Sequence, residues 1–339
     1  MAPSPRDALP NASARLPKHG LRSSQTRCAL FLLCLRWSTA SATATTLDLL
    51  HEPAALKALA TYQSDLPPPG ADANMTRSFT TREQYATFVT WLIGQVTAIP
   101  APEFVGADDP VGGKRPAMRY AGEMKPLTMQ NHRKLRALQR QLEDLIDRGV
   151  HGDIYETGIY RGGTAMFIAG VVHAYESLCV YEGRCAPAPR SAAPRSFWFF
   201  DSFAGFRHED ASSKLHNYTS EPFYAPLHLV RRAFARLGFL SVRRTHFVKG
   251  FFEETLLALG APSASIAMLR LDGDLYTSSR VVLEQLYPFV TSGGWVVIDD
   301  YKAYPWCRRA VNEFRTAHGL DNVTAPLTTE YARPSWKKP

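Results

Sequence analysis

Short apolar runs alternate with amphipathic stretches from about residue 128 to residue 320 of this 339-residue chain. Runs that are apolar at successive positions are typical of parallel strands buried on both faces. They lie at 154–155, 197–200, 246–248, 266–271 and 295–298, and stretches with helical spacing lie at 163–175, 227–237, 278–286 and 305–318. This alternation predicts an α/β fold with a doubly wound, mostly parallel sheet.

Two further helices are predicted ahead of the sheet. Leu135, Leu138, Leu142 and Leu145 recur at spacings of three and four, which predicts a helix over residues 129–147. A weaker helical pattern at 82–96 lies between Pro-rich and Gly-rich segments. We therefore expect an N-terminal helical cap with loops over residues 45–127, followed by the main domain at 128–339.

Residues 1–44 have the pattern of a targeting segment. They carry six basic residues and one acid, a net +5, so the rest of the chain holds only 8 − 5 = +3 of the total charge. An apolar run at 28–35 precedes small residues at 40–44, which is the order of a secretory signal, although an organelle transit peptide remains an alternative. The run is shorter than the roughly 20 residues of a membrane span, so no transmembrane span is expected.

Partners and compartment follow from the remaining composition. The low charge outside the leader and the lack of a basic-aromatic stripe disfavour nucleic-acid binding. Asn-x-Ser/Thr sequons at Asn11, Asn74, Asn217 and Asn322 favour the secretory pathway. Cys179 and Cys185 flank a short loop and are expected either as a disulfide or as two free thiols. The sequence leaves a homo-oligomer open.

Four carboxylates follow two of the apolar runs. Asp272 and Asp274 come after the run at 265–271, and Asp299 and Asp300 follow the run at 294–298. Ligands on parallel sheets gather at the carboxyl ends of the strands. Carboxylates placed together there repel one another unless a cation lies between them. The pattern predicts a hard metal ion beside a substrate pocket; the alternative is that these acids are turn residues or helix N-caps.

A glycine-rich turn follows the first run and leads into a helix. It begins at Glu156 and contains Gly158 and Gly162, but it lacks the G-x-G-x-x-G spacing of a dinucleotide site. An acid here would repel a pyrophosphate, whereas it suits the sulfonium and ammonium groups of S-adenosylmethionine. Asp201 and Ser202 follow the second run, where an acid can hold both hydroxyls of a ribose.

Together these motifs resemble the macrocin O-methyltransferase family, which methylates sugar hydroxyls on macrolide and aminocoumarin antibiotics. The resemblance covers roughly residues 128–320, with the motifs in family order, and is strongest over 269–276. It implies a class I S-adenosylmethionine-dependent methyltransferase that needs Mg²⁺.

The resemblance also implies roles for individual residues. Asp272, Asp299 and Asp300 would hold the metal, and Asp274 would be the general base. The cofactor would be enclosed by Thr128 and Met129. Its methionine end would be lined by Glu156, Gly158, Arg161 and Gly162. Asp201 and Ser202 would hold its ribose, and Gly250 and Phe251 would border its adenine. The alternatives are that Phe251 is a core residue and that Arg161 only pairs with an acid.

The implied chemistry restricts the acceptor. A sulfonium is a strong methyl donor, so the enzyme mainly has to align an oxygen for attack. An Asp with a pKa of about 4 cannot deprotonate an aliphatic hydroxyl unaided. A bound cation lowers the pKa of an oxygen that it coordinates. We therefore expect a bidentate acceptor such as a vicinal diol, most simply a sugar on a small molecule or glycan.

Three other functions are compatible with parts of this pattern. A glycosyltransferase with an Asp-x-Asp metal site would respond to a nucleotide sugar and would not need the turn at 156–163. A catechol-type methyltransferase would act on phenols. A methyltransferase fold retained as a binding protein would transfer no methyl group. Residues 177–195 and 322–339 depart from the family pattern, so the acceptor side is less well defined than the cofactor side.

Overall fold

A computed structural model of the protein describes residues 78–98, 101, 125–185, 195–207, 223–239, 245–262, 264–330 and 333–339. The chain divides into two units, Met1–Asp48 and Leu49–Pro339, and all of the described residues belong to the second. The predicted targeting segment at 1–44 and the sequons at Asn11, Asn74 and Asn217 lie outside the described residues. The sequon residue Asn322 is described and is exposed.

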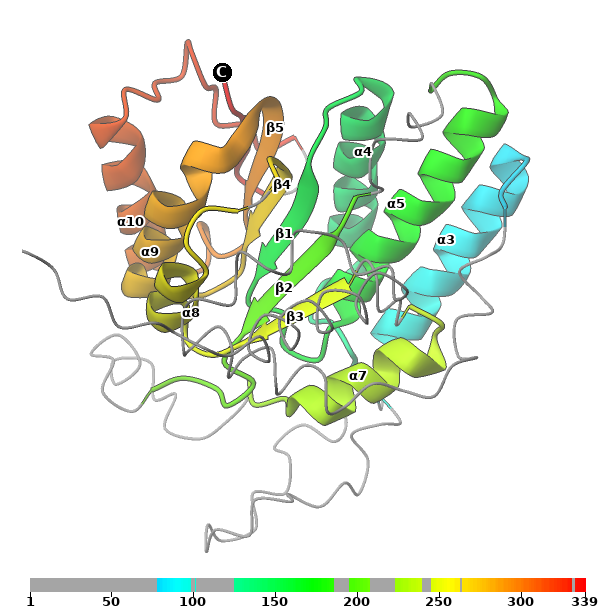
Figure 1. Ribbon diagram of the computed structural model, residues 1–339, viewed down its shortest axis with the longest axis horizontal. Helices are drawn as coiled ribbons and strands as arrows, with labels where there is room; N and C mark the ends of the chain where they lie inside the picture. Colours follow the sequence, from blue (N-terminus) through cyan, green and yellow to red (C-terminus); the bar gives the residue numbers. More distant parts are fainter. Residues whose placement is uncertain are drawn as a thin grey trace, which may run out of the picture. The chain divides into compact units, whose positions relative to one another are not determined.

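A six-stranded sheet forms the centre of the described fold (Figure 1). In spatial order its strands are β3 (Thr245–Lys249), β2 (Phe197–Asp201), β1 (Asp153–Thr157), β4 (Ile266–Leu271), β5 (Val290–Ile298) and β6 (Ser335–Lys337). The pairs from β3 to β5 are parallel, and only β6 is antiparallel to its neighbour. The predicted doubly wound, mostly parallel sheet is therefore confirmed.

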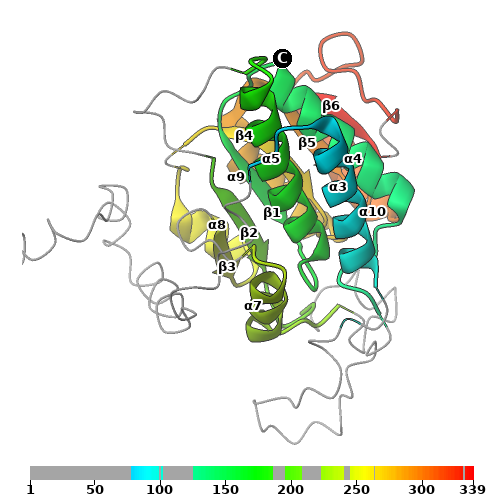
Figure 2. The ribbon, with the colours of Figure 1, turned by 90° about the vertical axis from the view of Figure 1, so that its right-hand side faces the viewer.

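Helices cover both faces of this sheet (Figures 1 and 2). One layer consists of α3 (Arg82–Thr97), α4 (His132–Asp147), α5 (Gly163–Tyr181) and α7 (Leu227–Arg236), and the other of α8 (Phe252–Leu259), α9 (Tyr276–Leu286) and α10 (Pro305–Ala317), with the short 3₁₀ helix η4 (Tyr287–Phe289) before β5. Alternate strand residues face the two layers: Ile154 belongs to the first apolar cluster and Tyr155 to the second. Because each face packs against a separate core, β2 and β4 are apolar at nearly every position.

The predicted helices exist, but one begins later than expected. α4 begins at His132 rather than at residue 129, because the side chain of Asn131 caps it by accepting the N–H of Lys134. Residues 128–130 are therefore outside the helix, and the Gln130 side chain reaches Asp299 at the end of β5. α8 and β6 were not predicted, since each is too short to show a clear period.

Helix α5 packs at the centre of its layer. It is long and apolar enough to cross a membrane, but 78% of its apolar window is buried within the fold. It contacts both α3 and α4, and Phe167 and Ile168 in its first half are fully buried. Its composition is accounted for by its place in the core.

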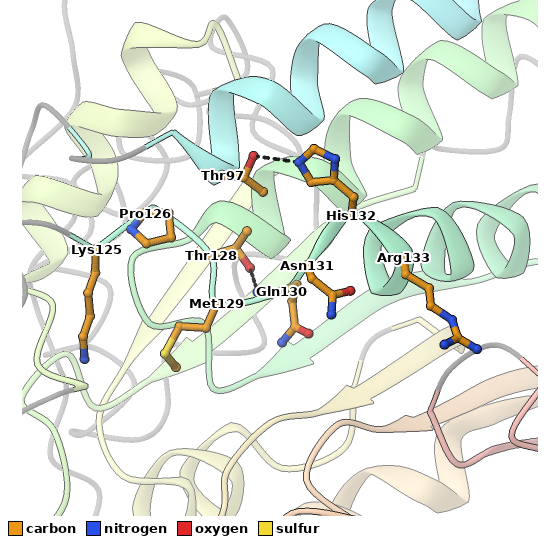
Figure 3. Close-up of a pocket in the computed structure, with 9 residues that line it drawn as sticks. All are labelled: Thr97, Lys125, Pro126, Thr128, Met129, Gln130, Asn131, His132 and Arg133. Carbon is orange, nitrogen blue, oxygen red and sulfur yellow. Dashed lines mark hydrogen bonds between the residues drawn. The ribbon is translucent and has the colours of Figure 1, made fainter.

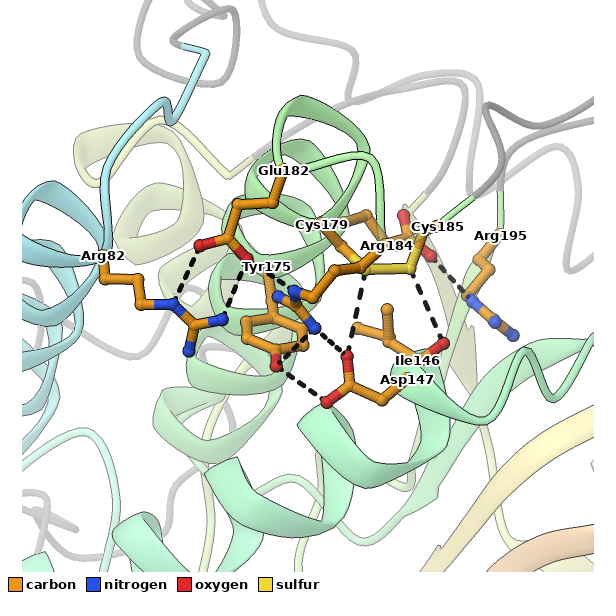
Figure 4. Close-up of a disulfide and its surroundings, with 10 residues drawn as sticks. Arg82, Ile146, Asp147, Tyr175, Cys179, Glu182, Arg184, Cys185 and Arg195 are labelled. Carbon is orange, nitrogen blue, oxygen red and sulfur yellow. Dashed lines mark hydrogen bonds and ion pairs between the residues drawn. A yellow bond between two sulfur atoms is a disulfide. The ribbon is translucent and has the colours of Figure 1, made fainter.

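A disulfide joins Cys179 and Cys185 at the end of α5 (Figure 4). Within the loop that it closes, Arg184 forms an ion pair with Asp147 of α4. The hydroxyl group of Tyr175 donates to the same carboxylate at 2.9 Å. The disulfide therefore closes a loop that links α5 to α4. Of the two sequence-based alternatives, the structure has the disulfide.

Candidate active site

The predicted site residues meet at the carboxyl ends of the parallel strands. Backbone hydrogen bonds continue past the strand ends: the N–H of Gly158 donates to Phe200 at 2.8 Å, and that of Asp272 to Thr157 at 2.8 Å. The N–H of Asp299 likewise donates to the carbonyl of Leu271 at 2.9 Å. The loops after β1, β2, β4 and β5 are thus aligned at the point where the strand order reverses, which is where such sheets bind ligands.

The two glycines of the turn after β1 are required by packing. Gly158 has φ = +86°, and a Cβ there would lie 1.8 Å from the carbonyl oxygen of Asp272. Gly162 has φ = +82°, and its Cβ would meet the side chains of Val230 and Phe234 at 2.9 and 2.8 Å. These contacts explain why both positions are Gly. Whether the two glycines also line a cofactor stays a prediction.

Glu156 places a buried carboxylate beneath this turn. The side chain is fully buried, and its Oε1 accepts a hydrogen bond from Nη1 of Arg270 at 2.5 Å. Within the described part of the chain, Oε2 has no hydrogen-bond partner. Burial raises the pKa of Glu156 to about 7, although the Arg270 charge opposes the shift. One carboxylate oxygen is therefore available to a cationic ligand.

Asp201 and Ser202 shape the turns around them. The Asp201 carboxylate accepts the N–H groups of Ile159 and Tyr160 at 2.8 and 3.1 Å and that of Phe203 at 2.8 Å. Removal from water still raises its pKa, because these three bonds offset the burial only in part. The Ser202 hydroxyl donates to the carbonyl of Gly205 at 2.7 Å. Asp201 thus fixes the glycine turn. Its Oδ2 accepts two of these N–H groups, whereas Oδ1 accepts that of Phe203 and retains a lone pair for a ligand hydroxyl.

The segment before α4 lies against the start of α5. The Thr128 and Thr164 hydroxyls are 2.7 Å apart, and both side chains are buried. Met129 is 51% exposed, so its thioether is free to cover a ligand. Arg161 is buried and donates through Nη1 to the carbonyl of Lys125 at 2.7 Å.

Gly250 and Phe251 lie after β3, beside the end of β2. The N–H of Gly250 donates to the Asp201 carbonyl at 2.9 Å, so this loop is aligned with the others. Phe251 precedes α8 and is half-buried, with the guanidinium carbon of Arg207 lying 4.0 Å from its ring centre. Phe251 is therefore not a fully buried core residue, and its ring lies against the Arg207 guanidinium.

Three of the four predicted carboxylates form a close cluster. Oxygens of Asp272, Asp274 and Asp300 all lie within 4.8 Å of one another. Asp274 has φ = +55°, a conformation that non-Gly residues rarely adopt, and its N–H donates to Oδ2 of Asp300 at 3.0 Å. Burial and the charge of Asp272 raise the pKa of Asp274 to about 7 and that of Asp300 well above its ordinary value. Such a group is stabilised by a hard cation.

Asp299 does not lie in the carboxylate cluster, although the sequence suggested it as a metal ligand. Its Oδ1 forms ion pairs with Arg333 and, at 3.2 Å, with Nη2 of Arg270. Its Oδ2 accepts from Nε2 of Gln130 at 2.9 Å. The structure thus brings together Asp272, Asp274 and Asp300 rather than Asp272, Asp299 and Asp300, because two arginines already neutralise Asp299. Arg270 also pairs with Asp272 at 2.8 Å, so Asp299 borders the cluster.

An open hollow lies between the end of α3 and the start of α4 (Figure 3). Its volume is about 640 Å³, and its lining comprises Thr97, Lys125, Pro126, Thr128, Met129, Gln130, Asn131, His132 and Arg133. No acid is among these described lining residues, so the hollow is not the acid cluster itself. It adjoins the cluster through Gln130, whose amide reaches Asp299.

Sequence reasoning missed three residues that organise the site: Gln130, Arg270 and Arg333. Arg270 is fully buried between Glu156 and Asp272. A basic residue within an otherwise apolar strand was a signal for it, since a buried Arg needs acidic partners. Gln130 and Arg333 come from segments far apart in the chain, and no local pattern identifies their contact.

The chain is similar to several known proteins. The family described as "Macrocin-O-methyltransferase (TylF)" matches residues 112–330. The chain is 36% identical to mycinamicin III 3''-O-methyltransferase of Micromonospora griseorubida over 60% of its own length and 77% of that protein. It is 36% identical to an 8-demethyl-8-(2,3-dimethoxy-alpha-L-rhamnosyl)-tetracenomycin-C 4'-O-methyltransferase of Streptomyces olivaceus, over 59% and 72% of the two chains. The solved structure of the O-methyltransferase NovP is similar with a TM-score of 0.55 and 26% identity, covering 75% of this chain and 99% of that one.

Proposed function

Because this chain belongs to the macrocin O-methyltransferase family and is an S-adenosylmethionine-dependent O-methyltransferase, we propose that it methylates a sugar hydroxyl held beside the Asp272–Asp274–Asp300 cluster. The proposal rests on two groups of acids that lie together at the carboxyl ends of the parallel strands. A cluster of three carboxylates, of which only Asp272 is ion-paired within the described residues, lies next to Glu156, whose Oε2 has no partner there.

The cofactor end is assigned to the turn after β1. Glu156 would face the ammonium group of S-adenosylmethionine through Oε2, since a buried carboxylate oxygen binds a cation more favourably than it stays alone. Asp201 and Ser202 would hold the ribose, Gly250 and Phe251 would border the adenine, and Thr128 with Met129 would cover the donor. Arg161, Gly158 and Gly162 would line the methionine side.

The metal end is assigned to the acids after β4 and β5. Asp272 and Asp300 would hold Mg²⁺ or another divalent cation, with Asp299 reaching it only by sharing an oxygen with its arginine partners. A bound divalent cation would lower the pKa of a coordinated hydroxyl and fix its position. The carboxylate of Asp274, within 4.8 Å of its neighbours' oxygens, would then accept the hydroxyl proton.

The acceptor is proposed to be a vicinal diol or a similar bidentate group on a sugar. The tetracenomycin methyltransferase named above acts, by its name, on a rhamnosyl-bearing molecule, and two oxygens can bind one cation side by side. Family membership decides against a glycosyltransferase. A catechol-type activity would show as methylation of simple catechols without methylation of sugars.

The direct test is transfer of a labelled methyl group from S-adenosylmethionine to a panel of sugars, glycosides and catechols, with Mg²⁺ and with chelator. Label on a sugar diol only when Mg²⁺ is present supports the proposal. Label on catechols alone, or no transfer by folded protein, would exclude it.

The secretory pathway is proposed as the compartment. The Cys179–Cys185 disulfide supports this, because disulfides persist in oxidising compartments. Detection of the protein in a reducing compartment with both thiols free would contradict it.

Replacing Glu156 with glutamine should weaken S-adenosylmethionine binding about tenfold or more, the equivalent of roughly 1.4 kcal/mol. The change keeps the side-chain shape but removes the charge that would face the donor's ammonium group. Calorimetric titration checks it, with Glu176→Gln, at a half-buried surface ion pair with Arg195, as the matched control. Unchanged affinity in Glu156→Gln would remove Glu156 from the binding role.

The stabilisation of the protein by Mg²⁺ should increase with pH. The folded-state pKa of Asp274 is about 7, above its unfolded value near 4, so its protonated form favours folding at low pH and that contribution is lost as pH rises toward 7. A cation held by Asp272 and Asp300 would bind more tightly when the neighbouring Asp274 carboxylate is ionised than when it is protonated. We expect the Mg²⁺-induced rise in Tm to be larger at pH 8 than at pH 6, as measured by calorimetry. An equal rise in Tm at pH 6 and pH 8 would contradict the assignment of the metal site to this carboxylate cluster.

A further inference from the structure

Arg333 reaches the active-site edge from the C-terminal segment that leads into β6. It is 1% exposed, yet its guanidinium contacts three groups that are distant in sequence. Nε pairs with the carboxylate of Asp299, Nη2 donates to Oε1 of Gln130, and Nη1 donates to the carbonyl of Lys134 at 3.3 Å. The C-terminal segment is thus bonded both to the loop after β5 and to the start of α4.

Arg333, Asp299 and Gln130 form a closed ring of side chains. Gln130 is held at both ends of its amide, because Nε2 donates to Oδ2 of Asp299 at 2.9 Å while Oε1 accepts from Arg333. The Gln130 N–H in turn donates to the Thr128 hydroxyl at 3.1 Å. The ring therefore fixes the backbone that presents Thr128 and Met129.

We propose that Arg333 is a positioning residue for methyl transfer, which holds Gln130 and Asp299 so that the 128–131 segment and the loop after β5 keep their catalytic arrangement. The inference rests on the proposed function and deepens it, because it assigns the C-terminal segment a role in the same site. Arg333 does not itself contact the proposed reacting groups; it acts through Gln130 and Asp299.

Only arginine fits this position among the basic residues. A planar guanidinium donates in several fixed directions and so serves Asp299, Gln130 and the Lys134 carbonyl together, whereas an ammonium group is a compact point charge. A buried arginine is also costly unless its partners are in place. The ring therefore forms as a unit, and loss of one member loosens the others.

The test compares Arg333→Met and Arg333→Lys with Arg315→Met. Arg315 is the matched control because it is also nearly buried beneath the C-terminal segment, donating to the Ala325 carbonyl at 2.7 Å with its guanidinium carbon 4.9 Å from the Trp336 ring centre. Its described contacts include neither Asp299 nor Gln130. Loss of Arg315 therefore reports general packing of the segment.

The first readout is amide hydrogen exchange of the full-length protein without substrate. Arg333→Met should speed exchange at residues 128–134 about tenfold or more, because those amides then open locally. Arg315→Met should leave that segment unchanged. If Arg333→Met does not fold, Gln130→Met removes the same ring from its other side and is expected to give the same result.

The second readout is the split between kcat and KM. Arg333→Met should lower kcat about 10²-fold at saturating donor with a smaller change in KM, since misplacement of about 1 Å has that effect on aligned groups. Arg333→Lys keeps the positive charge, but it should recover less than half of the kcat that Arg333→Met loses. Arg315→Met should lower Tm and keep kcat within about twofold of the wild type.

Unchanged exchange at 128–134 in Arg333→Met, or the same kcat loss in Arg315→Met, would overturn the proposal. The proposed function and the positioning role of Arg333 can fail independently. If the wild-type protein transfers no methyl group, the proposed function fails, whereas faster exchange in Arg333→Met still supports the positioning contact.

Discussion

Asp274→Asn should lower the turnover of methyl transfer by about 10²-fold or more while leaving S-adenosylmethionine affinity within about twofold. Asn keeps the size of the side chain and the strained backbone at φ = +55°, but it cannot accept the acceptor's proton. Single-turnover kinetics and calorimetric titration of the donor measure the two quantities separately.

Asp272→Asn is the comparison that separates proton transfer from metal binding. Asp272 is proposed as a ligand, so this variant should lose Mn²⁺ binding as observed by electron paramagnetic resonance, whereas Asp274→Asn should retain it. Wild-type turnover in Asp274→Asn would remove Asp274 from the role of base. Loss of Mn²⁺ binding in Asp274→Asn would instead make it a ligand, as its place in the cluster also permits.

The largest expected loss of stability follows from Arg270→Met, at roughly 3–5 kcal/mol of the free energy of unfolding at pH 7. Arg270 is fully buried and pairs with Glu156 at 2.5 Å and with Asp272 at 2.8 Å. Removing it leaves carboxylates buried without their compensating charge. Urea denaturation monitored by circular dichroism provides the measurement.

Arg280→Met provides the control for that result. Arg280 pairs with Glu284 one helical turn away on the exposed side of α9, where such a pair contributes about 0.5 kcal/mol or less. A loss in Arg270→Met no larger than in Arg280→Met would show that the buried acids do not depend on Arg270. The destabilisation by Arg270→Met should also shrink at pH 5, because Glu156, with its raised pKa, is then protonated.

Periodicity alone predicted most of the fold. The buried strands β1 to β5 are apolar on both faces, and α4 and α10 have a clear apolar stripe, so their presence follows from side-chain spacing. β6 and α8 were missed because each is too short for its side-chain spacing to show a period. The three-residue strand β6 forms because it pairs with β5. Such pairing cannot be recognised from the pattern of apolar residues in so short a segment.

The site was predictable where chemistry follows a strand directly. Glu156, Asp201, Asp272 and Asp300 lie where the strand ends place them, and the sheet register brings them to one edge. Asp299 was harder to predict, because its environment depends on Arg333 and Gln130, which are 34 and 169 residues away in sequence. The start of α4 was misplaced because the Asn131 cap outweighs the apolar pattern at Met129.

The central claim is that this fold binds S-adenosylmethionine beside a divalent cation. Calorimetric titration of the full-length protein with S-adenosylmethionine, first with Mg²⁺ and a sugar diol present and then with chelator, tests it most directly. The account predicts micromolar donor binding in both conditions, with methylated sugar formed only when Mg²⁺ is present. No heat of binding in either condition, from protein shown to be folded, would contradict it.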